Sequence, residues 1–543
     1  RRVLFRSVMT NMAEVGLPEM SIVTWILALS PVLVCLVLMM QFKMSGGRAG
    51  MLSWLISLAV ASFCFGGGID ILAAGTLKGL WTTIMVLYII WSSMFLYNIV
   101  NSTGSFKVIG AMFTRLTNGN RLLQLLILGW VFPSFIQGVC GFGVPVAVAA
   151  PLLLGLGFNP LLSVITPLLG HSWGITFGSL GASYSVLLQL SPVEPDRMAW
   201  IGSLFIAFGG LIVGFCIIHF YGGMKGIAEG TPAVLLLMGI MAAGLIIMCR
   251  FVSAYVATFV AGAAGLILGS ILLPKLPMYR PDPNAEPAPE DPEGNKFSFM
   301  TAFSAYIILI IVVLSAYLIP PLKAALETVT VGLPFPETVT SFGYTNAATE
   351  KYSALKILTT PGTLIVVSSI LAILFYKAKG ILPAGAVGQS LANTAKQSIG
   401  ATTTVMTMTM MAVIMTEAGM TTYVAYGIAM STGKLFAIFS PFIALLGGFV
   451  TSSGTSSNVL FTGLQYQVAD ILGISPYVVL AMQTTASSLS NSFSPGNTAL
   501  GCGVVGLSGR EGECLKVTGV YNVIQCLLVG ALGWVSCYIL NVK

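Results

Sequence analysis

One stretch of this chain, Gly447–Asn458, is dense in hydroxyl and amide side chains, although the segments on both sides of it are strongly apolar. Hydroxyls and amides can hold a polar or anionic ligand through hydrogen bonds without carrying a charge. In a bilayer, irregular backbone rich in Gly, Ser and Thr is tolerated only where it lines a cavity or is buried in protein. We therefore predict that this stretch is a binding hairpin in which Ser456, Ser457 and Asn458 contact a ligand.

The composition indicates that the chain lies in a membrane. Of its 543 residues, 56% are hydrophobic and only 8% are charged, whereas roughly a quarter of the residues in soluble domains are charged. With roughly 20 residues per span, about 12–14 transmembrane segments fit, counting broken ones. We expect an all-α polytopic membrane protein. The apolar runs of spanning length are Ile22–Met40, Leu80–Val100, Trp200–Tyr221, Phe251–Leu273, Ala302–Ile319 and Val520–Leu540.

The same composition argues against other classes of protein. The net charge of +7 arises partly from basic residues that flank hydrophobic runs, a pattern typical of cytoplasmic loops and not of nucleic-acid binding. The nine cysteines form no C-x-x-C pair and the two histidines cannot build a metal centre alone, so we expect neither a metal nor a cofactor. A membrane enzyme is disfavoured because there is no nucleophile elbow or nucleotide-binding loop. A channel is disfavoured because filter segments do not repeat.

A proline-rich connector divides the chain near its middle. Residues 274–299 are rich in proline and acidic residues, so we expect a solvated linker between a first transmembrane half, 22–273, and a second, 300–543. Residues 1–21 form an N-terminal tail, whose first residues are set aside as a candidate non-native extension because they lack an initiator methionine. A second polar stretch, Pro320–Pro361, is expected to lie outside the bilayer.

Similar segments occur in both halves, and each segment of the first half is separated from its counterpart in the second half by the same number of residues. Each half contains an irregular polar segment, an apolar segment, an LG-x-[NS]-P turn, a second apolar segment and a second irregular polar segment. Paired interruptions of this kind point to a site near the membrane midplane, with the halves related as inverted repeats; alternatively, the glycines only permit close helix packing. The matching segments are Gly138–Pro145 with Gly454–Phe461, Leu156–Leu161 with Leu472–Tyr477, and His171–Gly174 with Ser487–Ser490.

Eight short segments carry a resemblance to a known family. They are Phe95–Asn98, Thr103–Phe106, Phe142–Leu152, Gly155–Phe158, Thr455–Phe461, Gly463–Gln465, Phe493–Pro495 and Gly506–Glu511. In these segments the chain resembles the lactate permease family, over most of its length from about Gly79 onward. The resemblance implies a secondary transporter in the cytoplasmic membrane that imports 2-hydroxymonocarboxylates such as lactate and glycolate, usually with protons. The alternatives are a different organic anion with sodium coupling and, less favoured, a membrane enzyme.

The resemblance also implies which partners the protein has and where it departs from its family. The expected partners are a small organic anion and the lipid bilayer, with no nucleic acid; the oligomeric state stays open. The family usually has glutamate at Gln137, aspartate at Gly454 and lysine at Asn491. His171 and Glu417 stand where uncharged residues are common. Because losing an acid and a base together leaves no unpaired charge, we hypothesise that Gln137 and Asn491 keep a neutral, hydrogen-bonded version of a former ion pair.

Uncharged groups would then hold an anionic substrate. Helix N-termini present free N–H groups and a positive dipole to a carboxylate, and Pro145 and Pro495 suit the first turn of such helices. The predicted substrate-binding residues are Gln137, Gly141, Gly143, Ser456, Ser457, Asn458, Ser488, Ser490 and Asn491.

Two ionisable residues are candidates for coupling transport to protons. His171 could exchange a proton near neutral pH, or it is a buried neutral histidine bonded to a backbone carbonyl. Glu417 is a candidate coupling acid, or it caps a helix turn. Sodium stays open as the coupling ion, because hydroxyls, backbone carbonyls and unwound helix ends coordinate it without a titrating group. Asp70 and His219 are expected to be structural.

Overall fold

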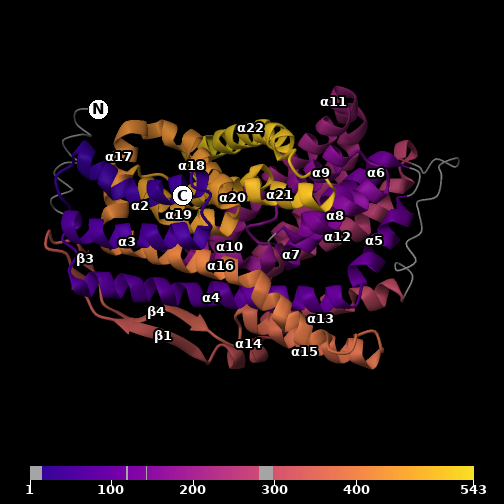
Figure 1. Cartoon of the computed structure of the whole chain (residues 1–543), viewed down its shortest axis with the longest axis horizontal. Coiled ribbons are helices and arrows are strands. Elements are labelled where there is room, and N and C mark those ends of the chain that lie inside the picture. Colours follow the sequence, from indigo (N-terminus) through magenta and orange to yellow (C-terminus); the bar gives the residue numbers. More distant parts are fainter. Residues whose placement is uncertain (1–14, 118–119, 142, 280–296, 543) are drawn as a thin grey trace.

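Helices form almost all of the molecule. The computed structural model describes residues 15–117, 120–141, 143–279 and 297–542; residues 1–14 of the predicted tail and 280–296 of the predicted linker lie outside the described residues. In the described part, 11 helices are long and apolar enough to cross a membrane. The prediction of an all-α polytopic membrane protein is confirmed (Figure 1). The inverted-repeat relation and the domain boundaries stay predictions.

The helices each pair most of the backbone N–H and C=O groups of their own segment, as a bilayer requires. Before the linker they are α2 (Ile22–Met40), α3 (Gly46–Phe65), α4 (Ile69–Ser102), α5 (Ser105–Leu116), α6 (Arg121–Leu126), α7 (Phe132–Val139), α8 (Val144–Gly155), α9 (Pro160–Ser172), α10 (Ala182–Gln189), α11 (Pro195–Phe251) and α12 (Ala257–Leu272). After it they are α13 (Phe299–Leu318), α14 (Pro320–Leu326), α15 (Pro361–Ala378), α16 (Ala386–Glu417), α17 (Met420–Thr432), α18 (Phe436–Thr451), α19 (Gly454–Ile471), α20 (Pro476–Leu489), α21 (Pro495–Val504) and α22 (Glu511–Tyr538).

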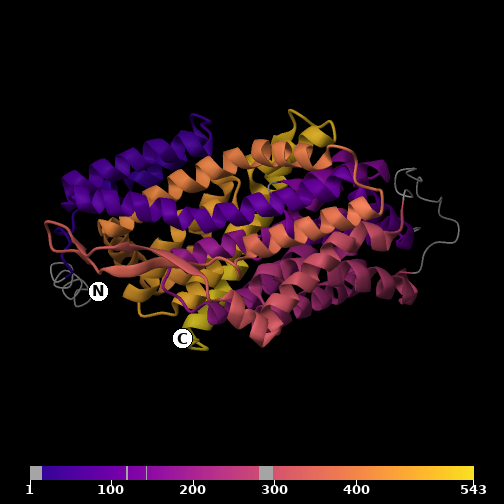
Figure 2. The ribbon, with the colours of Figure 1, turned by 90° about the horizontal axis from the view of Figure 1, so that it is seen from below.

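The two long helices α4 and α16 lie side by side through the molecule (Figures 1 and 2). They run antiparallel, because Trp91 Nε1 of α4 donates to Thr402 Oγ1 of α16 at 2.9 Å, and the start of α4 lies against the end of α16. Glycine permits the close approach: a Cβ placed on Gly79 would lie 2.7 Å from Met410 Cα. Small residues at helix contacts are the usual means of close packing inside membranes.

Four short strands form between α14 and α15. Strand β1 (Thr330–Phe335) pairs antiparallel with β4 (Thr349–Lys356), and β2 (Thr338–Val339) pairs with β3 (Thr345–Asn346). We call residues 330–356 the strand cap. It lies against the first part of α4, where Trp81 Nε1 donates to the Tyr352 carbonyl at 3.0 Å (Figure 2). The sequence predicted only a polar stretch here, without strands.

The helical backbone is interrupted at all four of the polar segments. The first two interruptions separate α7 from α8 and α9 from α10; the other two separate α18 from α19 and α20 from α21. Short 3-10 turns fill two of them, η2 (Ser179–Gly181) before α10 and η8 (Ser490–Phe493) before α21. Between each pair of interruptions the chain forms a helical hairpin, α8 with α9 and α19 with α20. The fold therefore supplies several helix ends inside an apolar bundle.

Candidate functional site

Asn458 lies at the centre of a buried hydrogen-bonded network. Its Nδ2 donates to Ser183 Oγ at 3.1 Å and to Thr484 Oγ1 at 2.9 Å. Its Oδ1 accepts from Ser487 Oγ at 3.2 Å and from Gln483 Nε2 at 3.4 Å. Since Ser183 belongs to α10 and the other partners to α20, this one amide joins the two halves of the chain.

The network continues from α19 toward α18. Gln483 Nε2 donates to Ser457 Oγ at 3.5 Å, and Ser457 Oγ donates to the Ala444 carbonyl at 2.9 Å. Gln465 Nε2 donates to Gln483 Oε1 at 3.2 Å, and its own Oε1 accepts from Ser440 Oγ at 2.8 Å. Each of these polar groups is paired, which buried polar networks require in order to be stable.

A second link between the halves runs through Thr176, in the interruption before α10. Its Oγ1 lies 2.9 Å from Thr484 Oγ1 and 2.8 Å from Ser488 Oγ. We call the connected set the polar junction. Its members are Thr176, Ser183, Ser440, Ser457, Asn458, Gln465, Gln483, Thr484, Ser487 and Ser488, all buried.

The two interruptions of the second half touch each other. Ser452, with a positive φ of 53°, accepts at its Oγ from the Gly496 N–H at 3.0 Å. Ser490 Oγ donates to the Ser487 carbonyl at 2.7 Å, and Gly448 leaves no room for a side chain against Ser490. Ser456 is buried beside Ser453, whose hydroxyl accepts from the Ser456 N–H at 3.2 Å and caps α19. The N-terminus of α19 is therefore fixed at the edge of the junction.

Asn491 has partners other than the predicted one. Its Nδ2 donates to the Ser487 carbonyl at 3.0 Å, and its Oδ1 accepts from Asn497 Nδ2 at 3.3 Å. A Cβ placed on Gly454 would lie 3.4 Å from Asn491 Nδ2. The hypothesis that Gln137 pairs with Asn491 is therefore wrong for this conformation, since Gly454 and Asn497 occupy the neighbourhood where Gln137 was expected.

Gln137 lies instead beside the interruption of its own half. A Cβ placed on Gly141 would lie 3.1 Å from Gln137 Nε2 and 2.7 Å from Ser179 Oγ, so a side chain there would displace the Ser179 hydroxyl. Ser179 and Leu180 have positive φ of 46° and 50°. Non-glycine residues in this region cost about 1–3 kcal/mol each and collect at functional sites. The second glycine predicted to bind substrate, Gly143, has a φ of 79° and lies near α21, with a Cβ position 3.6 Å from Asn497 Oδ1.

The electrostatics of the junction come from dipoles and not from fixed charge, because all its side chains are uncharged. Helix α8 has Pro145 in its first turn and α21 has Pro495 there, as predicted from the sequence. Helix N-termini carry unpaired N–H groups and about half a positive charge. Helix ends of this kind are in general suited to binding a small anion.

The two predicted coupling residues have different surroundings. His171 is buried and its Nδ1 lies 2.8 Å from the Pro167 carbonyl, which matches the backbone-bonded alternative. Glu417 is also buried, and its Oε2 accepts from Lys78 Nζ at 2.8 Å. It therefore forms an ion pair and does not simply cap a helix turn. Among the other ionisable residues, His219 contacts Tyr521 at 2.7 Å.

Sequence reasoning missed several residues of the site. Gln483 and Thr484 carry amide and hydroxyl groups inside the apolar α20, a signal that could have been read. Thr176, Ser183 and Asn497 carried no such signal, because their importance depends on contacts between distant parts of the chain. Lys78, a single lysine inside a long apolar helix, did carry such a signal, but its partner Glu417, 339 positions away, could not be identified from the sequence.

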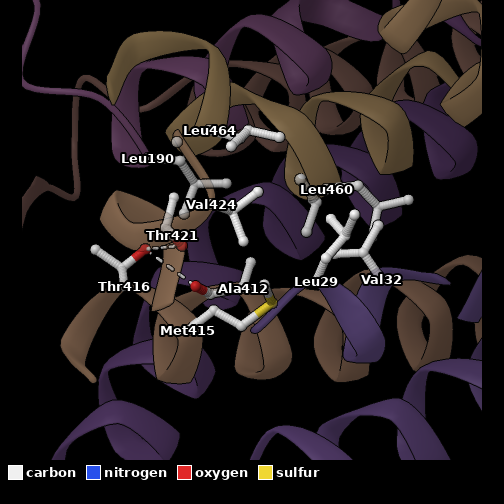
Figure 3. Close-up of a pocket in the computed structure, with 12 residues that line it drawn as sticks. Leu29, Val32, Leu190, Ala412, Met415, Thr416, Thr421, Val424, Leu460 and Leu464 are labelled. Atoms are coloured by element: carbon white, nitrogen blue, oxygen red, sulfur yellow. Dashed lines mark hydrogen bonds between the residues drawn. The ribbon is translucent and has the colours of Figure 1, made fainter. Parts of the chain in front are cut away.

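A small cavity lies next to the junction, between α2, α16, α17 and α19 (Figure 3). Its volume is about 30 Å³ and its lining is mostly aliphatic, with Thr416 and Thr421 in contact at 3.4 Å. A space of this size holds one or two waters and not a hydroxy acid. It extends from Thr416 to Val459, the residues next to Glu417 and Asn458 in the chain.

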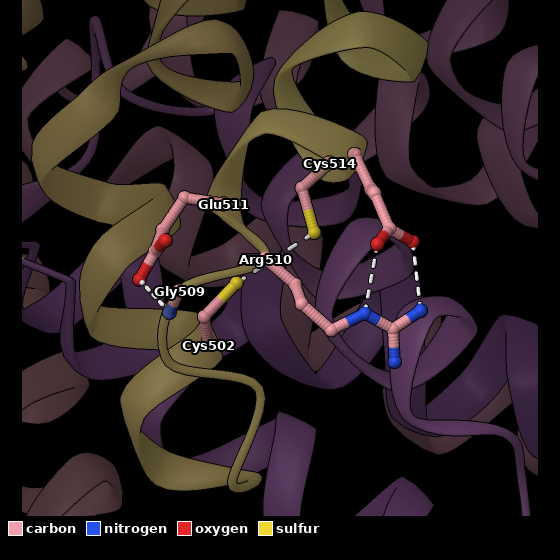
Figure 4. A network of polar contacts seen from close by, with 6 residues as sticks. Cys502, Gly509, Arg510, Glu511 and Cys514 are labelled. Carbon is pink, nitrogen blue, oxygen red and sulfur yellow. Dashed lines mark hydrogen bonds and ion pairs between the residues drawn. The ribbon is translucent and has the colours of Figure 1, made fainter.

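Helix α21, the short helix after the last interruption, is held to α22 at its far end. There Cys502 Sγ lies 3.7 Å from Cys514 Sγ (Figure 4). In the turn that follows α21, Arg510 makes two hydrogen bonds of 2.8 Å to Glu513, and Glu511 accepts from the Gly509 N–H at 3.0 Å. The ion pair between Arg510 and Glu513 is exposed, so it contributes little to the free energy of unfolding. Its two hydrogen bonds instead orient the turn between α21 and α22.

Apolar spanning helices, paired interruptions and a buried uncharged polar junction define a multi-pass membrane transporter. Residues 24–540 match the L-lactate permease family, so the chain belongs to that family. It is similar to the L-lactate permease of Salmonella typhi, with 28% identity covering 95% of this chain and 96% of that protein. It is similar also to the glycolate permease GlcA of Escherichia coli K12, with 26% identity and the same coverage, and to the L-lactate permease of that strain, with 28% identity. Members of the family are permeases, so the chain is a transporter and not an enzyme.

Proposed function

We propose that the protein imports a small 2-hydroxymonocarboxylate, lactate or glycolate, across the cytoplasmic membrane together with protons. The observation that carries the proposal is the polar junction: a fully buried set of hydroxyls and amides, centred on Asn458, where interrupted helices of both halves meet. Family membership supports the substrate class.

The substrate carboxylate is held by helix N-termini and hydroxyls at the edge of the junction. The N-termini of α19 and α21 supply those N–H groups of their first turns that are not already bonded to Ser453 or Ser452. The amide of Asn491, which has both a donor and an acceptor, recognises the 2-hydroxyl. The amide of Asn458 is fully bonded to protein groups, so it contacts the substrate only by exchanging one of them, its 3.4 Å contact with Gln483 Nε2, for the 2-hydroxyl. A site that hydrogen-bonds a hydroxyl discriminates strongly against analogues that lack it, because its buried groups are then left unpaired.

Proton coupling is assigned to Glu417, whereas His171 is given a structural role. Glu417 forms an ion pair with Lys78. Protonation of Glu417 removes its negative charge and so weakens its attraction to Lys78. His171, bonded to a backbone carbonyl, holds the end of α9.

Sodium symport of a different organic anion is the alternative. It is favoured by the same absence of fixed charge in the junction, since Na⁺ binds hydroxyl and carbonyl oxygens at unwound helix ends. In that case a sodium gradient, and not a proton gradient, drives uptake.

The test is uptake by purified protein in liposomes, with an imposed proton or sodium gradient. We expect saturable uptake of radiolabelled L-lactate under an inward proton gradient, with competition by glycolate and weak competition by short fatty acids and sulfonates. Uptake driven only by sodium would favour the alternative. No uptake of any 2-hydroxy acid under either gradient would contradict the proposal.

A further inference from the structure

Lys78 and Glu417 form a buried ion pair apart from the polar junction. Lys78 Nζ lies 2.8 Å from Glu417 Oε2, and the two side chains are only 4% and 9% exposed. Among the Asp, Glu, Lys and Arg residues that the structure describes, these are the two that are buried. Lys78 lies in the first part of α4 and Glu417 is the last residue of α16.

Stability does not account for such a pair. Removing two charges from water costs as much as, or more than, their attraction returns, and well-packed apolar residues often replace a buried pair without loss. Ionisable residues inside membrane proteins mark substrate or proton pathways by default. The pair is therefore a candidate for a role in transport.

The strand cap lies against the ion pair and contacts both of its residues. The Nζ atom lies 5.4 Å from the ring centroid of Phe335 and 5.3 Å from that of Tyr352. Asn346 of the cap donates from Nδ2 to the Glu417 carbonyl at 2.8 Å. Aromatic faces attract a cation without neutralising it. Lys78 thus has one carboxylate and two uncharged rings around it, and it stays a cation that a different carboxylate can pair with.

We propose that Lys78 receives the substrate carboxylate in exchange for Glu417, as a separate access site of the transporter. This inference rests on the proposed function. A proton from the aqueous phase binds the Glu417 carboxylate, which becomes neutral, and the Lys78 ammonium, still protonated, pairs with the incoming anion. One proton and one monocarboxylate enter together, so the site carries no net charge before or after the exchange.

The surroundings fit this exchange. The titratable groups that face Glu417 in the described structure are Lys78 of α4 and the phenols of Tyr344 and Tyr352 from the cap side. No second acid competes with the substrate there. The lining of the cavity in Figure 3 includes Thr416 and Val459, the chain neighbours of Glu417 and of Asn458.

Two variants test the proposal, Glu417→Gln and the double variant Lys78→Met/Glu417→Met, with Lys323→Met as a control that removes an exposed lysine. Uptake and counterflow of radiolabelled L-lactate are measured in proteoliposomes, and folding is checked by the melting temperature in detergent. We expect E417Q to keep lactate counterflow but lose its acceleration by a proton gradient. We expect the folded double variant to lose about tenfold or more of its uptake, the scale of a lost hydrogen bond between charged groups.

Either of two results would overturn the proposal: a folded double variant that transports like the wild type, or an E417Q protein whose uptake still responds to the proton gradient. If the double variant does not fold, E417Q decides alone. A wild-type protein that takes up no lactate would refute the proposed function itself, and with it this inference. Failure of this inference and failure of the proposed function are distinguishable, because only failure of the proposed function abolishes lactate uptake by the wild-type protein.

Discussion

At the scale of single residues, Asn458 uses its amide fully. Both of its polar atoms are buried and each contacts two side chains. Such a residue cannot be shortened without leaving several buried groups unpaired. The same contacts give the junction its shape, because the asparagine fixes the positions of α10 and α20 relative to α19.

We predict that Asn458→Ala lowers both stability and transport. Its former partners Ser183 and Thr484 lose a donor, at a cost of about 1–3 kcal/mol for each buried group left unsatisfied. The measurement is the melting temperature in detergent together with lactate uptake. Asn101→Ala, at an exposed position near the end of α4, is the matched control and should leave both unchanged. Equal behaviour of the two variants would show that the network is not needed.

Gly454, and not Gln137, is the residue that the structure places next to Asn491. A Cβ placed on Gly454 would lie 3.4 Å from Asn491 Nδ2 and 3.0 Å from Ile175 Cγ2. The acid at 454 and the base at 491 that the resemblance to the family implies would therefore fit a direct pair, whereas the expected partner, Gln137, lies beside Gly141.

We predict that Gly454→Asp alone and Asn491→Lys alone each reduce lactate uptake, because each places an unpaired charge in a buried site. The double variant should transport better than either single one. The measurement is a double-mutant cycle on initial uptake rates, with Gln137→Glu/Asn491→Lys as the comparison pair. Losses that simply add for G454D and N491K would rule out the direct pairing.

At the scale of elements, the antiparallel pair α4 and α16 is held together by close glycine contacts and by polar side chains along its length. At its far end from Lys78, Asn98 Nδ2 donates to Thr394 Oγ1 at 3.1 Å and to Gln397 Oε1 at 2.9 Å. Any increase in the distance between these helices also separates Lys78 from Glu417.

We predict that Gly79→Ala destabilises the protein, since the added Cβ would lie 2.7 Å from the Met410 backbone. Overpacking of this kind costs about 1–3 kcal/mol. Gly388→Ala, in α16 with open space around it, is the control and should hold or slightly raise the melting temperature, because alanine favours the helix. A G79A protein as stable as G388A would mean that the two helices can separate freely.

At the scale of the whole molecule, composition and apolar runs were enough to predict the membrane class, and the run Ile22–Met40 is a helix with the same bounds. The interruptions were also found, because Gly, Ser and Pro within apolar sequence leave a local signal. Contacts between distant segments could not be predicted, since Asn458 and Ser183 are 275 positions apart. The strand cap was missed although Val331, Leu333 and Phe335 alternate in β1, because Gly332 and Pro334 between them are disfavoured inside strands.

The central claim is that uncharged groups at the polar junction hold the transported anion. A cryo-EM structure of the protein in lipid nanodiscs with saturating L-lactate tests this most directly. We predict density for the ligand within hydrogen-bond distance of Asn458 or Asn491, at the N-termini of α19 and α21. Ligand density only at other places, in a preparation that transports lactate, with the junction contacts unchanged, would contradict the account.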